Sequence, residues 1–165
     1  MALGPSPRRG VALAAAALAG AAAAAFTRRL ARFEVLESSM EPALGRGDYL
    51  IALTGAPVQR GDIVLYPDPA MPARYLVKRA VGLPGEKVAI ADGRVMINGA
   101  VLTEAWADGP THPDGEWAIS PASIFTLGDN RRLSSGDGRT SGPIPLTAVH
   151  KAVWRYWPPR AFGGL

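Results

Sequence analysis

Hydrophobic residues follow two different patterns along the chain, and the change falls near residue 30. Residues 11–26 form an unbroken apolar run, rich in alanine, with arginine pairs at positions 8–9 and 28–29. Extended by one residue at each end, this run would make a helix of roughly 27 Å, close to the hydrocarbon thickness of a bilayer. The pattern predicts a short N-terminal segment, 1–10, followed by a transmembrane helix, 11–27. A cleavable secretory signal is the alternative, because a basic start, a short apolar centre and small residues also characterise such signals.

From Phe33 onward, short β-type runs alternate with glycine, proline and aspartate. This texture predicts a mostly β domain, a small β-barrel on a tether, over residues 28–165. Asp92-Gly93 lies between two such runs and predicts a two-residue hairpin, since a type I′ turn needs positive φ at both positions. Asn98-Gly99 predicts a further turn. The expected strands are Phe33–Leu36, Tyr49–Leu53, Asp62–Tyr66, Arg74–Val81, Lys87–Ala91, Arg94–Ile97, Ser123–Leu127 and Val149–Tyr156.

Composition and charge exclude several classes of function. The formal net charge is +4 and the pI about 9.8, but the arginines are scattered along loops and around the apolar run, which argues against a nucleic-acid partner. The chain has no cysteine, so it has no disulfide, no thiol nucleophile and no zinc site that needs a thiolate. His112 and His150 have no metal-like partner at close spacing. We therefore expect neither a metal nor a cofactor.

Ser39 is the first residue with a candidate chemical role. A protease without cysteine, metal or a suitably placed histidine must activate a hydroxyl by another route, and a desolvated lysine can supply one. Ser39 lies in the segment L-E-S-S-M-E-P-A-L, where an apolar strand ends in a turn and Pro42 prevents regular structure. Such a serine would be held at the edge between a strand and a loop, although serine beside proline is also ordinary in loops.

Lys78 interrupts an otherwise apolar, β-type run within R-Y-L-V-K-R-A-V-G-L-P-G-E-K-V. Side chains alternate along a strand, so Lys78 and Arg79 face opposite ways and one of them must face inward. Burial disfavours the charged form of a lysine and so lowers its pKa, which would make Lys78 a useful base. Arginine does not deprotonate, so Arg79 is unsuited to this task.

The segment L-G-D-N-R-R-L-S-S-G-D-G-R, residues 127–139, follows a predicted strand and is polar and rich in glycine. A solvated loop is its ordinary interpretation. Its serine, aspartate and arginine residues could also form a hydrogen-bonded and ion-paired network of the kind that holds a catalytic base in place.

Taken in order, these segments resemble the bacterial type I signal peptidase family, which are Ser/Lys serine proteases. The resemblance covers nearly all of the chain after residue 33, and the base segment is its most specific part. It implies a signal-peptidase-like β-barrel or β-sandwich and one N-terminal membrane helix. The matching segments are Ser39-Met40-x-Pro42, Gly47-Asp48, Gly61-Asp62-Ile63-Val64, Lys78-Arg79-Ala80-Val81-Gly82-Leu83-Pro84-Gly85-Glu86, Gly128-Asp129-Asn130-Arg131 and Arg155-Tyr156-Trp157-Pro158-Pro159.

The resemblance also implies a role for individual residues. Ser39 would be the nucleophile and Lys78 its general base, and Ser135 would hydrogen-bond and orient the lysine amine. Two supporting pairs would be Asp129 with Arg79 and Asp137 with Arg139.

The chain departs from the family pattern at two places. The last motif has one extra residue after Arg131 and a glycine in place of its final serine, so Ser134 remains an alternative to Ser135. Glu37 occupies the position where many members carry a serine that donates to the oxyanion. A carboxylate would repel that oxyanion, so we expect the Glu37 side chain to face away from it. The Ser39 N–H would then contribute more of the hydrogen bonding that stabilises the oxyanion.

For partners, the resemblance implies signal peptides of exported preproteins, with small residues one and three positions before the cut. An extended peptide lying along residues 33–36 and 74–77 would present alternate side chains to shallow apolar pockets. The expected lining residues are Val35, Met40, Leu44, Leu76 and Val77. The second partner would be the lipid bilayer: the protein would be single-pass in the bacterial inner membrane, with the catalytic domain on the extracytoplasmic side.

Three alternatives remain beside a general signal peptidase. The first is a dedicated maturation peptidase of the same family. The second is a LexA-like self-cleaving Ser/Lys protease, which would need a DNA-binding or soluble N-terminal region in place of the apolar run. The third is a tethered β domain that only binds partners, against which the intact Ser39 and Lys78 argue.

Overall fold

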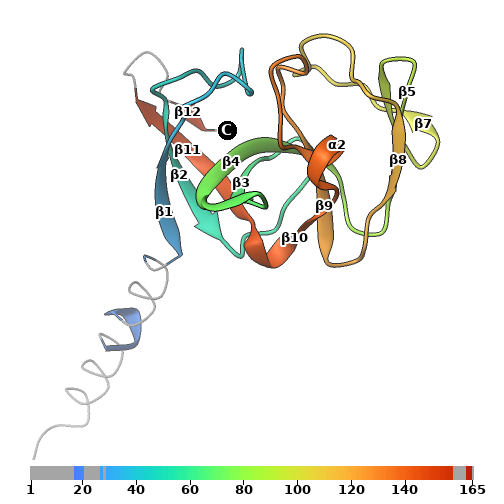
Figure 1. Cartoon of the computed structure of the whole chain (residues 1–165). Helices are drawn as coiled ribbons and strands as arrows, with labels where there is room; N and C mark the ends of the chain where they lie inside the picture. The colour runs from blue at the N-terminus through green and yellow to red at the C-terminus, as the bar shows by residue number, and fades with distance from the viewer. Residues whose placement is uncertain (1–16, 21–26, 28, 158–162, 165) are drawn as a thin grey trace, which may run out of the picture.

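A computed structural model describes residues 17–20, 27, 29–157 and 163–164, and its strands form two antiparallel sheets (Figure 1). The larger sheet has the order β1-β2-β11-β3-β4-β9-β10, with β12 paired to β11, and the smaller has the order β7-β6-β5-β8. The strands are β1 Leu30–Glu34, β2 Tyr49–Thr54, β3 Ile63–Asp68, β4 Met71–Gly82, β5 Lys87–Ala91, β6 Arg94–Ile97, β7 Ala100–Val101, β8 Gly115–Ala118, β9 Ser123–Leu127, β10 Ile144–Pro145, β11 His150–Trp157 and β12 Gly163–Gly164. Two short helices, α2 Gly138–Ser141 and the 3₁₀ helix η1 Leu146–Ala148, lie on either side of β10.

Strand β3 is buried on both faces, and this divides the core of the larger sheet in two. Ile63 and Leu65 pack with the residues that surround the turn after β1. Val64 and Tyr66 point the other way and pack against residues of β4, β9 and β10. Because a strand buried on both sides reads as a continuous apolar run, the sequence I-V-L-Y accounts for this central position.

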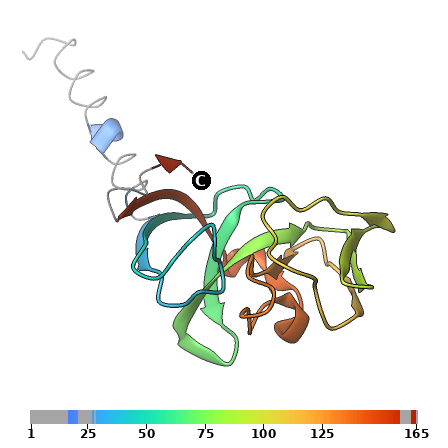
Figure 2. The same cartoon turned by 90° about the horizontal axis from the view of Figure 1, so that it is seen from above.

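The smaller sheet packs at the opposite end of the molecule from β1 and β2, as Figures 1 and 2 show. Its central hairpin, β5–β6, turns at Asp92 (φ 50°) and Gly93 (φ 76°), which confirms the predicted two-residue turn. Asn98 and Gly99 also have positive φ and join β6 to β7. A third apolar cluster, centred on Val88, Ile90 and Phe125, joins this sheet to β9.

The prediction of a mostly β domain is confirmed, whereas the predicted closed barrel is wrong. Within the described residues, each sheet runs from one edge strand to another without closing. Each of the eight predicted strands has a counterpart, although β1 begins earlier and ends at Glu34. The sequence pattern did not predict four short strands of two to four residues each: β7, β8, β10 and β12. Runs this short do not establish a period, so their pairing depends on contacts with neighbouring strands.

The predicted membrane helix, 11–27, and the segment before it lie largely outside the described residues. Of that range, only 17–20 and 27 are described; they are helical and exposed. In the portions of the chain that the structure describes, no helix combines the length and apolarity needed to cross a bilayer.

Candidate active site

Ser39 lies in a turn that follows β1 and is anchored by buried neighbours. Met40 and Leu44 are fully buried in the core, and the Leu44 N–H donates to the Met40 carbonyl at 2.9 Å. Before the turn, Val35 is hydrogen-bonded through its N–H to Asp48 and through its carbonyl to Gly47. Apolar anchors on both sides therefore hold Ser39, which is 3% exposed, at one place between strand and loop.

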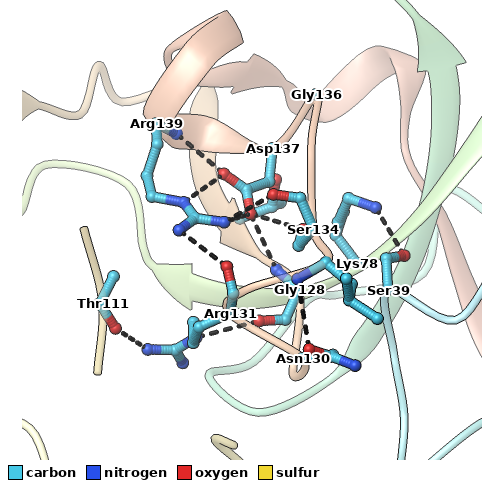
Figure 3. A network of polar contacts seen from close by, with 12 residues as sticks. Ser39, Lys78, Thr111, Gly128, Asn130, Arg131, Ser134, Gly136, Asp137 and Arg139 are labelled. Atoms are coloured by element: carbon cyan, nitrogen blue, oxygen red, sulfur yellow. Dashed lines mark hydrogen bonds and ion pairs between the residues drawn. The ribbon is translucent and has the colours of Figure 1, made fainter. Parts of the chain in front are cut away.

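Lys78 meets Ser39 from the middle of β4. Its side chain is 1% exposed, and Nζ donates to Ser39 Oγ at 2.9 Å (Figure 3). The neighbouring Arg79 projects from the other face of the strand, as alternation requires. It is also largely covered, however, because Trp106 and Asp129 pack over that face. Both Lys78 and Arg79 therefore face other parts of the protein, whereas strand alternation required only one of them to face inward.

Burial lowers the pKa of the Lys78 ammonium below its ordinary value. The negative charges of Asp137 and Glu37 oppose this shift, while the positive charges of Arg74 and Arg139 reinforce it. Among the described residues, Lys78 forms no ion pair with any carboxylate. The amine therefore gives up its proton at a lower pH than a lysine in water does.

The loop after β9 carries two ion pairs beside this site. Asp129 is fully buried and binds Arg79 through both oxygens, at 2.7 Å from Nε and 2.5 Å from Nη2. Burial raises the pKa of Asp129, and the paired guanidinium opposes that shift. Asp137 pairs with Arg139 at 2.8 Å.

Asp137 is the centre of the hydrogen-bonded loop in Figure 3. Besides Arg139, it accepts from the Ser134 hydroxyl at 2.7 Å and from the Gly128 N–H at 3.1 Å. Burial on its own would disfavour the carboxylate, but the contacts with Arg139 and Ser134 outweigh it and lower the pKa of Asp137. Asp137 therefore remains a carboxylate that fixes the loop around it.

The two neighbouring serines of this loop, Ser134 and Ser135, lie in different surroundings. The side chain of Ser134 packs on Gly128, where an added Cβ would come within 2.2 Å of Ser134 Oγ and 2.7 Å of the Ser39 carbonyl oxygen. Ser135 is exposed. Of the two serines that the sequence left open, Ser134 is the one whose hydroxyl binds within the loop, to Asp137.

A buried ion pair between Arg131 of the same loop and Glu104 was not predicted from the sequence. Arg131, whose side chain is 1% exposed, binds both oxygens of Glu104 and also contacts the Thr111 hydroxyl. Its Nε donates to the Gly128 carbonyl at 2.9 Å. Arg131 stands in the motif Gly128-Asp129-Asn130-Arg131, and an arginine that becomes buried requires a carboxylate partner. Nothing local identified Glu104 as that partner.

A groove of about 440 Å³ opens beside the Ser39–Lys78 pair. Its walls come from β1 with the segment that follows it and from residues 73–78 of β4, which were the two expected stretches. Val35, Leu76 and Val77 line it. Met40 and Leu44 lie in the core instead, because the turn directs their side chains under Ser39 and away from the groove.

Glu37 and the histidines also lie in defined surroundings. The Glu37 carboxylate forms an ion pair with Arg74 at 3.1 Å. His150 Nδ1 is 2.7 Å from Thr54 Oγ1, and burial lowers the pKa of its imidazole. His112 is at the surface, 4.0 Å from Asp114. No cluster of His, Asp and Glu within the described residues is arranged to hold a metal ion.

Known proteins resemble this chain in sequence and in fold. The profile of the family described as "Signal peptidase, peptidase S26" matches residues 8–157. The chain is similar to signal peptidase I of Leptolyngbya laminosa, with 36% identity over 142 residues that cover 77% of this chain and 68% of the relative. It is also similar to signal peptidase I of Bacillus caldolyticus, with 33% identity over 144 residues, 75% of this chain and 78% of the relative. A solved signal peptidase I from Enterococcus faecalis superposes with a TM-score of 0.52 at 28% identity, covering 59% of this chain and 97% of that one.

Proposed function

The chain belongs to the signal peptidase family, peptidase S26, and from that membership we propose that it removes signal peptides from exported proteins with Ser39 as nucleophile and Lys78 as general base. A serine endopeptidase of this family needs a base that accepts the hydroxyl proton. The observation that carries the assignment is the 2.9 Å contact between Lys78 Nζ and Ser39 Oγ in a buried setting. Because burial lowers the pKa of Lys78, the neutral amine becomes accessible as the proton acceptor.

In the first half of the proposed reaction, neutral Lys78 takes the proton of Ser39 Oγ as this oxygen attacks the scissile carbonyl carbon. The carbonyl oxygen becomes an oxyanion. The Ser39 N–H makes no hydrogen bond within the described part of the chain and is free to donate to it. Protonated Lys78 then gives its proton to the leaving nitrogen, which leaves an acyl group on Ser39.

In the second half, a water molecule replaces the departed amine. Lys78 takes a proton from that water as it attacks the acyl carbon, and the second tetrahedral intermediate collapses to release the signal peptide as a carboxylate. The proton returns to Ser39 Oγ, so the enzyme is restored. Asp137 would hold the loop after β9 in place near the lysine, through the hydrogen bonds that it accepts from the Ser134 hydroxyl and the Gly128 N–H.

The groove supports the substrate side of the proposal. Within the described residues, β4 pairs with β9 only from Arg79 onward, so residues 74–78 keep one edge without a strand partner. An extended peptide could add to that edge and present alternate side chains to the apolar wall of Phe33, Val35 and Val77. We also propose residues 11–27 as a membrane anchor that holds residues 28–165 on the extracytoplasmic side. The LexA-like alternative loses its support because the chain matches the signal peptidase family over most of its length.

The test is cleavage of a synthetic signal-peptide substrate by the purified full chain, followed by mass measurement of both products. We expect a single cut after an alanine, and a loss of at least about tenfold in rate when leucine replaces alanine at both positions, one and three before the cut. Equal cleavage of the leucine peptide would contradict the proposed recognition. Absence of any cut would contradict the proposed activity.

A further inference from the structure

Three charged side chains form a cluster at the rim of the groove, which we call the rim cluster: Glu37, Asp68 and Arg74. Arg74 donates to Asp68 Oδ2 from Nη2 at 2.8 Å and from Nε at 3.1 Å, and to Glu37 Oε1 from Nη1 at 3.1 Å. The side chains of Glu37 and Arg74 are about half exposed, at 52% and 45%. Glu37 lies two residues before Ser39 and Arg74 four residues before Lys78, and all four residues line the same groove.

The two faces of β4 differ in character along the groove. Tyr75 and Val77 project to one side, where Tyr75 contacts the Phe33 ring with centroids 4.9 Å apart and Val77 packs against the core cluster that contains Val35. Arg74 and Leu76 project to the other side, which is also the side of Lys78. The apolar wall and the rim cluster therefore lie on opposite sides of a peptide added to this edge.

A bound strand must distribute its side chains between these two sides. The inference rests on the proposed function, in which small residues one and three positions before the cut face the apolar wall. Because side chains alternate along a strand, the residue between them, two positions before the cut, points to the side of Arg74 and Leu76. Its side chain would emerge at the rim cluster if it is long enough to pass Leu76.

The charges of the rim cluster do not cancel. Hydrogen bonds from the Ala70 and Met71 N–H groups and from Arg74 lower the pKa of Asp68, so it is a carboxylate at neutral pH. Two carboxylates then face one guanidinium, which leaves one negative charge. Near Lys78, Asp137 and Arg139 neutralise each other, and the working form of Lys78 is uncharged. Glu37 is the more exposed carboxylate and can exchange its contact with Arg74 for one with an incoming cation.

We propose that Glu37 makes this enzyme prefer a lysine or arginine two positions before the cleaved bond and disfavour an acidic residue there. Either basic side chain is long enough to carry its charged head from this side of the peptide to the Glu37 carboxylate. An exposed ion pair of this kind corresponds to a change of about two- to fivefold in kcat/KM, and the preference should shrink as salt is added.

The experiment uses the full chain and three peptides that share alanine one and three positions before the cut and carry lysine, glutamine or glutamate between them. We expect kcat/KM to fall in that order, by about two- to fivefold at each step. Glu37→Gln should flatten the series, and Glu37→Lys should invert it. Glu34→Gln is the matched control: it removes a carboxylate of the same groove whose contact is with Tyr49, and it should keep the order.

The outcomes separate a failure of the Glu37 preference from a failure of the proposed peptidase activity. Equal rates for the three peptides in the unmodified enzyme, or an order that Glu37→Lys leaves unchanged, would overturn the inference while leaving the peptidase activity established. Cleavage of none of the three, the glutamine peptide included, would overturn the proposed function and the inference with it.

Discussion

Two regions of the candidate active site bury cationic side chains in different ways. Around the loop after β9, three largely buried arginines each have a carboxylate partner: Arg79 with Asp129, Arg131 with Glu104 and Arg139 with Asp137. Lys78 is as deeply buried as Arg131, yet the described residues offer it a hydroxyl, Ser39, and no carboxylate in contact. These three arginines are each neutralised by an ion pair, whereas Lys78 has no such pair among the described residues.

The difference follows from what each cation can do when water is removed. A guanidinium stays protonated at any ordinary pH, so a buried arginine without a partner would cost several kcal/mol. A lysine has another option, since it can release its proton and become a neutral amine. The paired arginines therefore surround the site with neutralised charges, and in the proposed mechanism the unpaired lysine is the base among them. Three predictions test this contrast, from the largest expected effect to the smallest.

The largest effect should come from changing the unpaired lysine or its partner serine. Ser39→Ala and Lys78→Ala should each reduce kcat/KM by at least about 10³-fold, because nucleophile and base act as one unit. Lys78→Arg should be equally inactive, since arginine cannot give up its proton. Rates are measured with a signal-peptide substrate, and circular dichroism checks that each variant keeps its fold. A Lys78→Arg enzyme with substantial activity would remove the base role from Lys78.

Removing one partner of a paired arginine should instead act on stability. Asp129→Ala leaves Arg79 buried without its carboxylate and should lower the free energy of unfolding by about 3–5 kcal/mol. The control is Glu116→Gln, which breaks the exposed pair with Lys87 and should cost no more than about 1 kcal/mol. Urea unfolding measures both. If both variants lost only about 1 kcal/mol of unfolding free energy, burial would not make the Arg79–Asp129 pair more important for stability than the exposed Lys87–Glu116 pair.

The smallest effect concerns pH. Because the pKa of Lys78 is lowered in the fold, kcat/KM should rise with pH and level off below the ordinary lysine value. Stability should rise with pH as well. Between the lowered pKa of Lys78 in the folded chain and its unfolded value of 10.5, the unfolded chain binds more protons than the folded chain does. The unfolding free energy, measured relative to a Lys78→Met variant, should therefore increase with pH across that window. A rate that is flat from neutral to alkaline pH would contradict the unpaired, neutral lysine.

Much of the fold was accessible from local sequence. The hairpin at Asp92-Gly93 follows from the positive φ that its turn requires, and the long strands follow from runs of β-type residues. The short strands β7, β8, β10 and β12 could not be predicted, because two to four residues carry no period. The closed barrel was a wrong prediction for a related reason: closure depends on how edge strands meet, and no single segment encodes that.

The sequence by itself determined which residues could do the chemistry. Ser39, Lys78 and the Asp129–Arg79 and Asp137–Arg139 pairs were predictable because they lie in motifs whose residues and spacing are specific. Only the tertiary structure decided that Ser134 faces inward and Ser135 outward, since one residue of loop geometry separates the two outcomes. It also decided that Glu104 neutralises Arg131 across 27 positions and that Glu37 reaches Arg74 across 37. Such contacts join segments that are distant in the sequence, and they exist only once the strands have brought those segments together.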